Sequence, residues 1–514
     1  MGIFNRASTL ALAASLLVLA PGTQAVGADN GAWGETRFQT GCDPGPAPPP
    51  PWPDPTVTQT PPADAPEQVT LDVELDQQPQ KASRPILGSG FNFEHALWSC
   101  PAFRSLFRSE ILDPFQPAIA RVDSGLLPAA PAELPAWALG PAVYESVLSS
   151  APYADSWRFF KRLDRAGVKI VLGVWGGPAQ FTLDGTRRGV LDPAHYDDYV
   201  EYVATLVHFI VHSQDVQLWA TTIANEPDGG DGNQIPPEGL AYIAHQLAPR
   251  VAADGVKLYG PDTADSQTAV QYLPALLNDP LVASNLAFVG FHQYYPSIQV
   301  SDVVAMVHQH LPELPVVVTE YTSFNFGDLD AGQEAHNEYG FTLDAAATLL
   351  SHYREGAAAA LYWDAVDYLQ PGHDAITRWG LLRGPDRDFA RRPRYYGLLQ
   401  ILPYLQPGAS ILADRQVGGA ELHTLEVRTP TGQPAIVLVS QDFGELGMTI
   451  QLNGADVTHY PNWSVTRFAR GHLDDSLGRQ QFQQGTAHLI LPPRSITTLF
   501  PSGESPLPET ASGL

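Results

Sequence analysis

From about residue 87 the chain repeats one pattern eight times, a short apolar run followed by a helical segment. Continuous Val, Ile and Leu runs are typical of strands buried on both faces, and their alternation with helices implies parallel pairing. Eight such units over roughly 310 residues match a (β/α)8 barrel in number and size. The runs cover residues 87–93, 118–123, 168–174, 216–224, 256–262, 286–295, 315–321 and 358–365.

A doubly wound open sheet is the alternative fold for alternating strands and helices. Such a sheet usually carries a glycine-rich phosphate-binding turn after its first strand. The segment Gly-Ser-Gly-Phe-Asn-Phe at residues 88–93 lacks the third glycine of that fingerprint. We therefore expect an α/β fold with a (β/α)8 TIM barrel over residues 85–405.

The helical pattern ends after about residue 406. Four segments then read as antiparallel strands joined by polar turns, and Thr431-Gly432 stands where a hairpin turn is expected. The sequence thus predicts a C-terminal antiparallel β-sandwich over residues 406–501. An alternating apolar and polar strand within residues 68–84 is expected to join this sandwich.

The N-terminus has the layout of a secretory signal peptide over residues 1–25. Arg6 is followed by an apolar run from Leu10 to Ala20 and by small residues ending at Ala25. An uncleaved anchor is the alternative, but no later stretch is apolar for the ~20 residues that a membrane helix needs. We therefore expect a secreted protein, extracellular or periplasmic, without a membrane span.

Two segments outside the predicted domains are expected to lack a fold of their own. Residues 26–67 form a proline-rich linker, and residues 502–514 form a flexible tail. The chain has two cysteines, Cys42 and Cys100. In an exported protein they are compatible with one disulfide, although two free thiols are also possible.

The charge balance excludes one class of partner. The chain has 29 basic and 55 acidic residues and a formal net charge of −26, which would repel a nucleic-acid backbone. An acidic surface suits a secreted protein that meets neutral substrates. We expect a monomer.

Polar and aromatic residues follow the predicted strands, and in a barrel this rim carries the chemistry. Glu226 follows the fourth strand and Glu320 the seventh. Hydrolysis of an acetal needs an acid to protonate the leaving oxygen and a base or nucleophile on the opposite face of the sugar, and two carboxylates in unlike environments supply both. Four aromatic residues at the rim could stack on sugar rings: Trp98, Trp175, Tyr294 and Trp363.

The segments IANEPDG (223–229) and VVVTEYTS (316–323), with Arg121, His292, Tyr294 and Trp363 on the intervening strands, resemble the clan of retaining glycoside hydrolases built on (β/α)8 barrels, clan A. The resemblance implies that Glu226 is the acid/base and Glu320 the nucleophile. The resemblance further implies that Asn225 forms a hydrogen bond with the sugar 2-hydroxyl and that Arg121 and Tyr294 hold Glu320 ionised. It also implies that Trp363 forms the floor of the sugar-binding subsite, with His292 beside it. The segment at 394–410, followed by a β-sandwich, is most similar to glycoside hydrolase family 30.

The sequence thus predicts a secreted retaining β-glycoside hydrolase that cleaves O-glycosidic bonds of a polysaccharide or oligosaccharide by double displacement. Repulsion between the two carboxylates is expected to keep Glu226 protonated. We expect no cofactor and no metal, because Glu94 and His95 have no further ligands at matching spacing, and residues 228–233 are expected to be a plain loop. A non-catalytic carbohydrate-binding protein and a transglycosylase are the alternatives. The sugar and the linkage stay open.

Overall fold

The computed structural model describes residues 66–76, 85–123, 141–150, 153–229, 231–294, 299–323, 338–368 and 377–504. The predicted signal peptide, Cys42, most of the proline-rich segment and residues 505–514 lie outside this part of the chain. The possible disulfide between Cys42 and Cys100 therefore stays a prediction.

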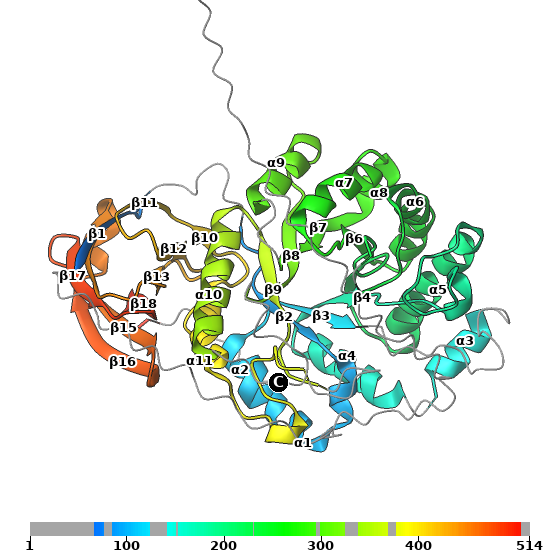
Figure 1. Cartoon of the computed structure of the whole chain (residues 1–514), viewed down its shortest axis with the longest axis horizontal. Helices are drawn as coiled ribbons and strands as arrows, with labels where there is room; N and C mark the ends of the chain where they lie inside the picture. The colour runs from blue at the N-terminus through cyan, green and yellow to red at the C-terminus, as the bar shows by residue number, and fades with distance from the viewer. Residues whose placement is uncertain are drawn as a thin grey trace, which may run out of the picture. The chain divides into compact units, whose positions relative to one another are not determined.

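Eight parallel strands close into a barrel in sequence order, which confirms the predicted fold class (Figure 1). Each observed strand lies within one of the eight predicted apolar runs and is shorter than that run. The strands are β2 (Gly90–Phe93), β3 (Ile119–Asp123), β4 (Lys169–Gly173), β5 (Leu218–Thr221), β6 (Lys257–Pro261), β7 (Leu286–His292), β8 (Val316–Tyr321) and β9 (Ala359–Tyr362).

Helices surround the barrel and bury one apolar face each against it. Their positions follow from the 3.6-residue period of apolar side chains between the strands. In the described ranges they are α1 (Pro101–Phe107), α2 (Asp113–Phe115), α3 (Pro141–Leu148), α4 (Ala154–Arg165), α5 (Tyr196–His208), α6 (Pro237–Ala253), α7 (Ser266–Leu277), α8 (Pro280–Asn285), α9 (Val300–His310), α10 (Glu338–Arg354) and α11 (Pro393–Leu399). Two π-helical turns, η2 (Arg108–Leu112) and η7 (Phe209–Ser213), continue α1 and α5.

The barrel interior changes from apolar to polar along each strand. A small cluster of buried apolar side chains, including Ile119, Val317 and Leu361, fills the lower part. Side chains two residues further on point to the same side of a strand, because the side-chain period of a strand is two. This period places Arg121 above Ile119 and Trp363 above Leu361, so the apolar floor supports a polar rim.

The second domain is built from two sheets. One has the strand order β11-β1-β14-β17 and the other β10-β12-β13-β18-β15-β16. β1 (Glu67–Glu74) pairs in parallel with β14 and antiparallel with β11. The remaining strands are β10 (Ser410–Ile411), β11 (Ala413–Val417), β12 (Leu422–Arg428), β13 (Pro434–Ser440), β14 (Leu446–Asn453), β15 (Asn462–Ala469), β16 (His472–Gln481), β17 (Thr486–Leu491) and β18 (Ser495–Pro501).

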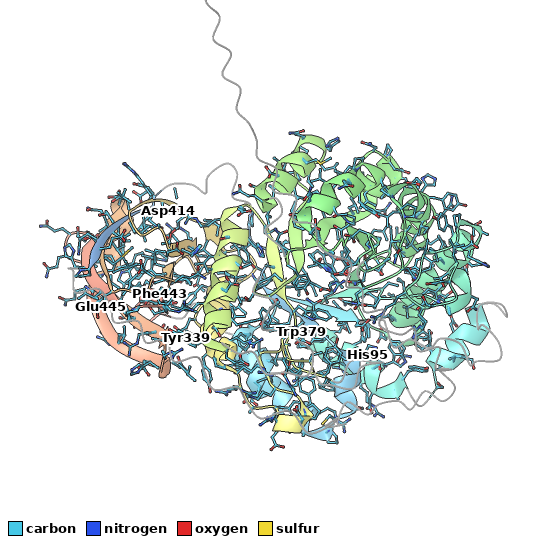
Figure 2. The ribbon with its side chains drawn as sticks, viewed as in Figure 1. His95, Tyr339, Trp379, Asp414, Phe443 and Glu445 are labelled. Carbon is cyan, nitrogen blue, oxygen red and sulfur yellow. The ribbon has the colours of Figure 1, made fainter. Side chains whose placement is uncertain are left out.

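The sandwich packs against α10 and α11 of the barrel. Val437 and Val439 of β13 join the apolar cluster of the barrel helices, whereas Ile436 and Leu438 face the interior of the sandwich. Tyr339 of α10 stacks on Phe468, with ring centroids 5.2 Å apart. Figure 2 labels Tyr339 and also Asp414, whose carboxylate accepts from Arg354 at the end of α10 at 3.0 Å. None of the helices in the described ranges is long and apolar enough to cross a membrane.

Candidate active site

Glu320 points into the barrel because β8 is irregular at its carboxyl end. Val317 and Thr319 face inward, so strict alternation would turn Glu320 outward. The pairing of β7 with β8 shifts register between Phe291 and His292, and His292 pairs with Glu320. A bulge of this kind re-aims the side chain beside it. Glu320 is consequently buried inside the rim, with 4% of its surface exposed.

The Glu320 carboxylate accepts two hydrogen bonds, one from the Arg121 guanidinium and one from the Tyr294 hydroxyl at 2.5 Å. Burial raises the pKa of Glu320, whereas the positive charges of His292 and Arg121 and the Tyr294 hydroxyl favour its ionised form. The net shift is upward. Arg121 and Tyr294 therefore contact the carboxylate, but they offset only part of the effect of burial.

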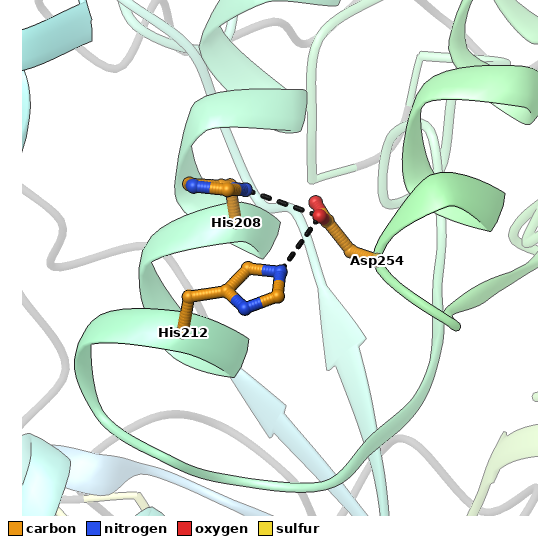
Figure 3. A group of neighbouring side chains, drawn as sticks. All are labelled: His208, His212 and Asp254. Atoms are coloured by element: carbon orange, nitrogen blue, oxygen red, sulfur yellow. Dashed lines mark hydrogen bonds and ion pairs between the residues drawn. The ribbon is translucent and has the colours of Figure 1, made fainter.

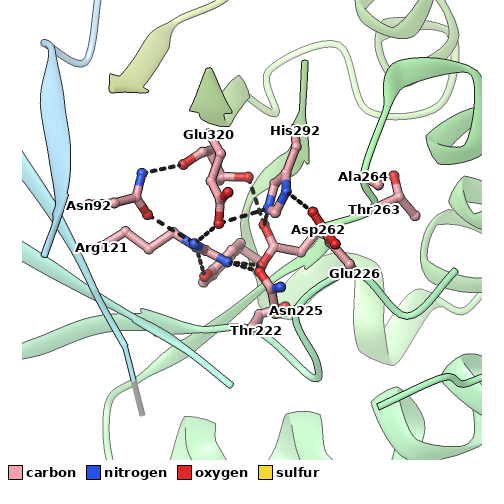
Figure 4. Close-up of polar contacts among 12 residues, drawn as sticks. Asn92, Arg121, Thr222, Asn225, Glu226, Asp262, Thr263, Ala264, His292 and Glu320 are labelled. Atoms are coloured by element: carbon pink, nitrogen blue, oxygen red, sulfur yellow. Dashed lines mark hydrogen bonds and ion pairs between the residues drawn. The ribbon is translucent and has the colours of Figure 1, made fainter. Parts of the chain in front are cut away.

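Arg121 organises the floor of the site from a fully buried position. Its guanidinium donates to five acceptors from four other segments of the barrel (Figure 4). These are Glu320, Asn92 at 2.9 Å, Asn225 at 2.6 Å, Asp262 at 2.8 Å and the Tyr259 hydroxyl at 3.0 Å. The guanidinium also lies 4.1 Å from the centre of the Trp175 ring. A buried cation with this many acceptors fixes the relative positions of the strand ends that supply them.

Glu226 is held by a strained backbone just beyond β5. Its φ of 40° lies in the left-handed region, which non-glycine residues seldom adopt and which is common at functional sites. Its N–H donates to the carbonyl of Asp262 at 2.9 Å. One carboxylate oxygen lies 2.9 Å from Nδ1 of His292, and the other accepts from the backbone N–H of Asp231 at 2.5 Å.

The expectation that repulsion keeps Glu226 protonated is wrong for the free protein. Burial alone would raise the pKa of Glu226. The hydrogen bond and positive charge of His292 and the N–H of Asp231 outweigh burial, so the net shift of the pKa is downward. The contacts of an ionised carboxylate with donors and a cation decide its pKa more than a second carboxylate does.

His292 connects all three buried carboxylates of the site. Its ring nitrogens lie 2.9 Å from Glu226, 3.3 Å from Glu320 and 3.5 Å from Asp262. Burial lowers the pKa of His292, but the surrounding carboxylates raise it further, to about 10. The ring is thus cationic at neutral pH, and together with Arg121 it places two positive charges among the carboxyl groups of Glu226, Glu320 and Asp262.

The two glutamates lie close together. One oxygen of each carboxylate and one ring nitrogen of His292 are all within 4.8 Å of one another. Two oxygens and a nitrogen could also hold a divalent cation, but the Arg121 guanidinium on Glu320 disfavours a second positive charge there. The arrangement suits two carboxylates that act on the two atoms of one bond, one on each atom.

The aromatic residues predicted at the rim fall into two groups. The rings of Trp175 and Trp363 lie 5.7 Å apart at 31°, above the Arg121 layer, and Trp363 is half-buried. Trp98 instead packs among Phe103, Phe107 and Phe159 beneath helix α4, with ring centroids 5.3 to 6.2 Å apart. The structure therefore does not bring Trp98 to the carboxylates.

The Asn225 side chain is engaged on both sides. It accepts from Arg121 and donates to the carbonyl of Asp231 at 2.9 Å. The amide nitrogen carries a second N–H, so a bond to a sugar hydroxyl does not require either contact to open. Glu94 and His95 are buried beside β2, where His95 lies 2.8 Å from the Ser156 hydroxyl and burial lowers the pKa of the ring to about 4.

Two contributors were missed as site residues in the sequence. Asp262 binds Arg121 and accepts from the Thr319 hydroxyl at 2.7 Å, and its pKa is depressed because Arg121 and His292 outweigh burial. Its place at the end of the fifth strand is the signal that could have identified it. Asp231 contributes its backbone N–H to Glu226, although the loop at residues 228–233 was expected to have no function. A backbone contact of this kind leaves no pattern of side chains in the sequence.

The comparisons with known proteins point to one group of enzymes. A family model described as "Glycosyl hydrolase catalytic core" matches residues 213–353, a stretch that contains Glu226, His292 and Glu320. No curated protein sequence gives a significant match.

Solved structures share the fold of most of the chain at low identity. A glycoside hydrolase family 30 subfamily 8 xylanase from Clostridium acetobutylicum is 17% identical over 84% of this chain and 99% of its own, with a TM-score of 0.65. An endo-β-1,6-glucanase is 16% identical over 85% and 94%, with a TM-score of 0.62. A family 44 xyloglucanase from Paenibacillus polymyxa is 11% identical over 85% and 100%, with a TM-score of 0.55. The predicted resemblance to barrel glycoside hydrolases is confirmed by the family match and by this shared fold.

Proposed function

We propose that this chain is a secreted retaining β-glycoside hydrolase that cleaves O-glycosidic bonds of a neutral glycan. The observation that carries the proposal is the pair of carboxylates from Glu226 and Glu320, placed within 4.8 Å of each other by two different strands. Retaining enzymes hold their carboxyl groups about 5–5.5 Å apart, whereas inverting enzymes leave about 6.5–9.5 Å for a water molecule. The spacing favours direct attack by one carboxylate.

Glu320 is the nucleophile in this proposal. Its oxygen forms a bond to the anomeric carbon while the bond from that carbon to the leaving oxygen breaks, which gives a covalent glycosyl-enzyme. Arg121 and Tyr294 orient the carboxylate, and the positive charges of Arg121 and His292 favour its ionised form and offset part of the effect of burial on its pKa. Activation comes from fixed dipoles and charges that need no reorganisation during the reaction.

Glu226 is the acid/base, and it shares its proton with His292. In the free protein the proton resides on His292, 2.9 Å from a Glu226 oxygen. As negative charge develops on the leaving oxygen, that proton passes through Glu226 to the departing group. In the second step Glu226 accepts a proton from the attacking water, and the bond to Glu320 breaks.

A panel of substrates tests the proposal. Initial rates and product anomers are measured by reducing-sugar release and NMR on β-linked xylan, β-1,6-glucan and xyloglucan, and on aryl β-glycosides. The wild type is expected to release the β-anomer first. We expect Glu320→Gln to lower kcat by at least about 1,000-fold and Glu226→Gln by about 100- to 10,000-fold.

Glu238→Gln is the matched control, because Glu238 is an exposed glutamate in the first turn of α6. Loss of activity in this variant as well would indicate a general defect. Activity that survives Glu320→Gln refutes the site. Binding without turnover by the wild type would favour a carbohydrate-binding protein, and products longer than the substrate would indicate a transglycosylase.

A further inference from the structure

Two histidines and an aspartate converge on the surface of the barrel, away from the carboxylate site (Figure 3). Nδ1 of His208 and Nε2 of His212 lie 3.1 and 2.9 Å from the same oxygen of Asp254. The two rings are 4.4 Å apart. All three ligand atoms lie within 4.8 Å of one another.

The local structure aligns these side chains before any ligand binds. His208 ends α5 and His212 lies in the π-helical turn η7. Residues four apart lie on one face of a helix, so the side chains of His208 and His212 point in similar directions. Asp254 is fixed as the C-cap of α6, with its N–H bonded to the carbonyls of Val251 and Ala252. Its side chain is 13% exposed.

The cluster has the donors and the dimensions of a transition-metal site. Two imidazole nitrogens and one carboxylate oxygen suit Zn²⁺ and similar ions, whereas Ca²⁺ and Mg²⁺ prefer oxygen alone. Around a tetrahedral Zn²⁺ such ligand atoms lie about 3.3–3.5 Å apart. The observed separations of 3.1 and 2.9 Å need only a small opening. Both rings are 51% exposed, so solvent can reach the remaining coordination positions and the outer ring nitrogens.

We propose that His208, His212 and Asp254 form a surface site for a divalent transition metal such as Zn²⁺. The site joins the end of α5 to the turn between α6 and β6. Asp254 precedes β6 at the amino-terminal rim of the barrel, whereas Glu226 follows β5 at the carboxyl rim. A metal here stabilises the barrel and takes no part in the reaction, because the amino-terminal face of such barrels serves stability.

Zinc titration of the full-length protein tests the site. After treatment with EDTA and dialysis, ZnCl₂ binding is measured by calorimetry, and the melting temperature is measured with and without ZnCl₂. The coordination is checked with Co²⁺ by visible absorption. We expect His212→Ala and His208→Ala to weaken the tightest Zn²⁺ binding at least about tenfold, to abolish the rise in melting temperature and to leave glycosidase rates unchanged.

His245→Ala is the matched control, since His245 is equally exposed and lies 2.6 Å from Asp279 without a second histidine. This variant should bind Zn²⁺ like the wild type. Melting of all variants in EDTA verifies that they fold. Equal Zn²⁺ affinity in the wild type and in His212→Ala would overturn the proposal, as would wild-type affinity weaker than a Kd of about 1 mM. Binding that persists in His212→Ala but is lost in Glu320→Gln would assign the metal to the carboxylate site instead.

Discussion

At the scale of single residues, His292 holds the candidate active site together. It is a fully buried ring surrounded by the carboxylates of Glu226, Glu320 and Asp262, which raise its pKa to about 10. A buried charge is tolerated only when it is paired and hydrogen-bonded. His292 and Arg121 provide this pairing for the carboxylates. The imidazole of His292 contacts both Glu226 and Glu320. Stability and the proposed catalysis are therefore coupled through one imidazole.

This coupling predicts a pH dependence of stability. The pKa of His292 is raised from 6.5 in the unfolded chain to about 10 in the folded protein. A raised pKa means that the folded state binds the proton more tightly, so the stabilisation is complete below pH 6.5 and is lost as the pH rises through about 10. Below pH 6.5 we expect the wild type to unfold at a higher urea concentration than His292→Gln. We expect the difference between the two urea midpoints to shrink as the pH rises towards 10.

The exposed His245 offers a control for this measurement. His245→Gln should follow the wild type across the whole range, because its ring is half-exposed and lies outside the cluster. A difference between the wild type and His292→Gln that stays constant from pH 6.5 to pH 10 would contradict the prediction. Such a result would mean that the ring contributes packing rather than charge.

At the scale of elements, the loop after β5 contacts Glu226, the residue proposed as the acid/base. The backbone N–H of Asp231 donates to Glu226, and the next residue, Gly232, lies against the backbone of Asn225. A Cβ added at Gly232 would lie 1.7 Å from the carbonyl oxygen of Asn225. Only glycine allows this approach, so the loop position and the Glu226 contact depend on one missing side chain.

Gly232→Ala is therefore expected to impair catalysis more than folding. The added methyl group must push the loop away from Asn225 and break the Asp231 contact, and misplacement by about 1 Å can cost about 100-fold in rate. We expect a fall of that order in kcat and a small change in melting temperature. Gly444→Ala is the control, because the nearest atom to its added Cβ is 3.6 Å away. Unchanged kcat in Gly232→Ala would show that the loop does not position Glu226.

At the scale of the whole molecule, the sandwich completes the apolar surface of the barrel. Val437, Val439 and Ile496 belong to the same cluster of buried residues as the barrel helices. In addition, β1 precedes the barrel in sequence but pairs with β14, which follows it. Strands from before and after the barrel in sequence are thus joined in one sheet.

This arrangement predicts that the barrel is not independently stable. A chain that ends before β10 would expose the faces of α10 and α11 that now contact the sandwich, and it would leave β1 without a partner strand. Exposed apolar surface of this kind promotes aggregation. We expect a large loss of soluble protein and no cooperative melting transition for the shortened chain, measured by sedimentation and calorimetry. A soluble shortened chain with the melting temperature of the full chain would refute this.

The sequence by itself determined the fold class and the strand ends that face the rim. Eight apolar runs that alternate with helices predict a parallel sheet covered by helices on both faces, and the missing glycine fingerprint favours a closed barrel over an open sheet. Polar residues directly after such runs collect at one edge of the sheet. Glu226 and Glu320 were predicted as a pair on this basis, whereas the roles of Arg121, His292 and Tyr294 came from the resemblance to barrel glycoside hydrolases. The structure brings all five together. Local periodicity contains this information because it depends only on neighbours along the chain.

Only the tertiary structure decided the pKa values of these groups and which aromatic residues lie next to them. The bulge that turns Glu320 inward, the backbone N–H of Asp231 and the contacts of His292 arise between segments far apart in sequence. These contacts lower the pKa of Glu226, although like-charge repulsion predicted the opposite. Trp98 packs among the helices rather than at the rim. Its position after β2 in the sequence does not specify whether its side chain points to the rim or to the helices. Electrostatic and packing energies depend on distances in space, and spacing along the chain does not contain them.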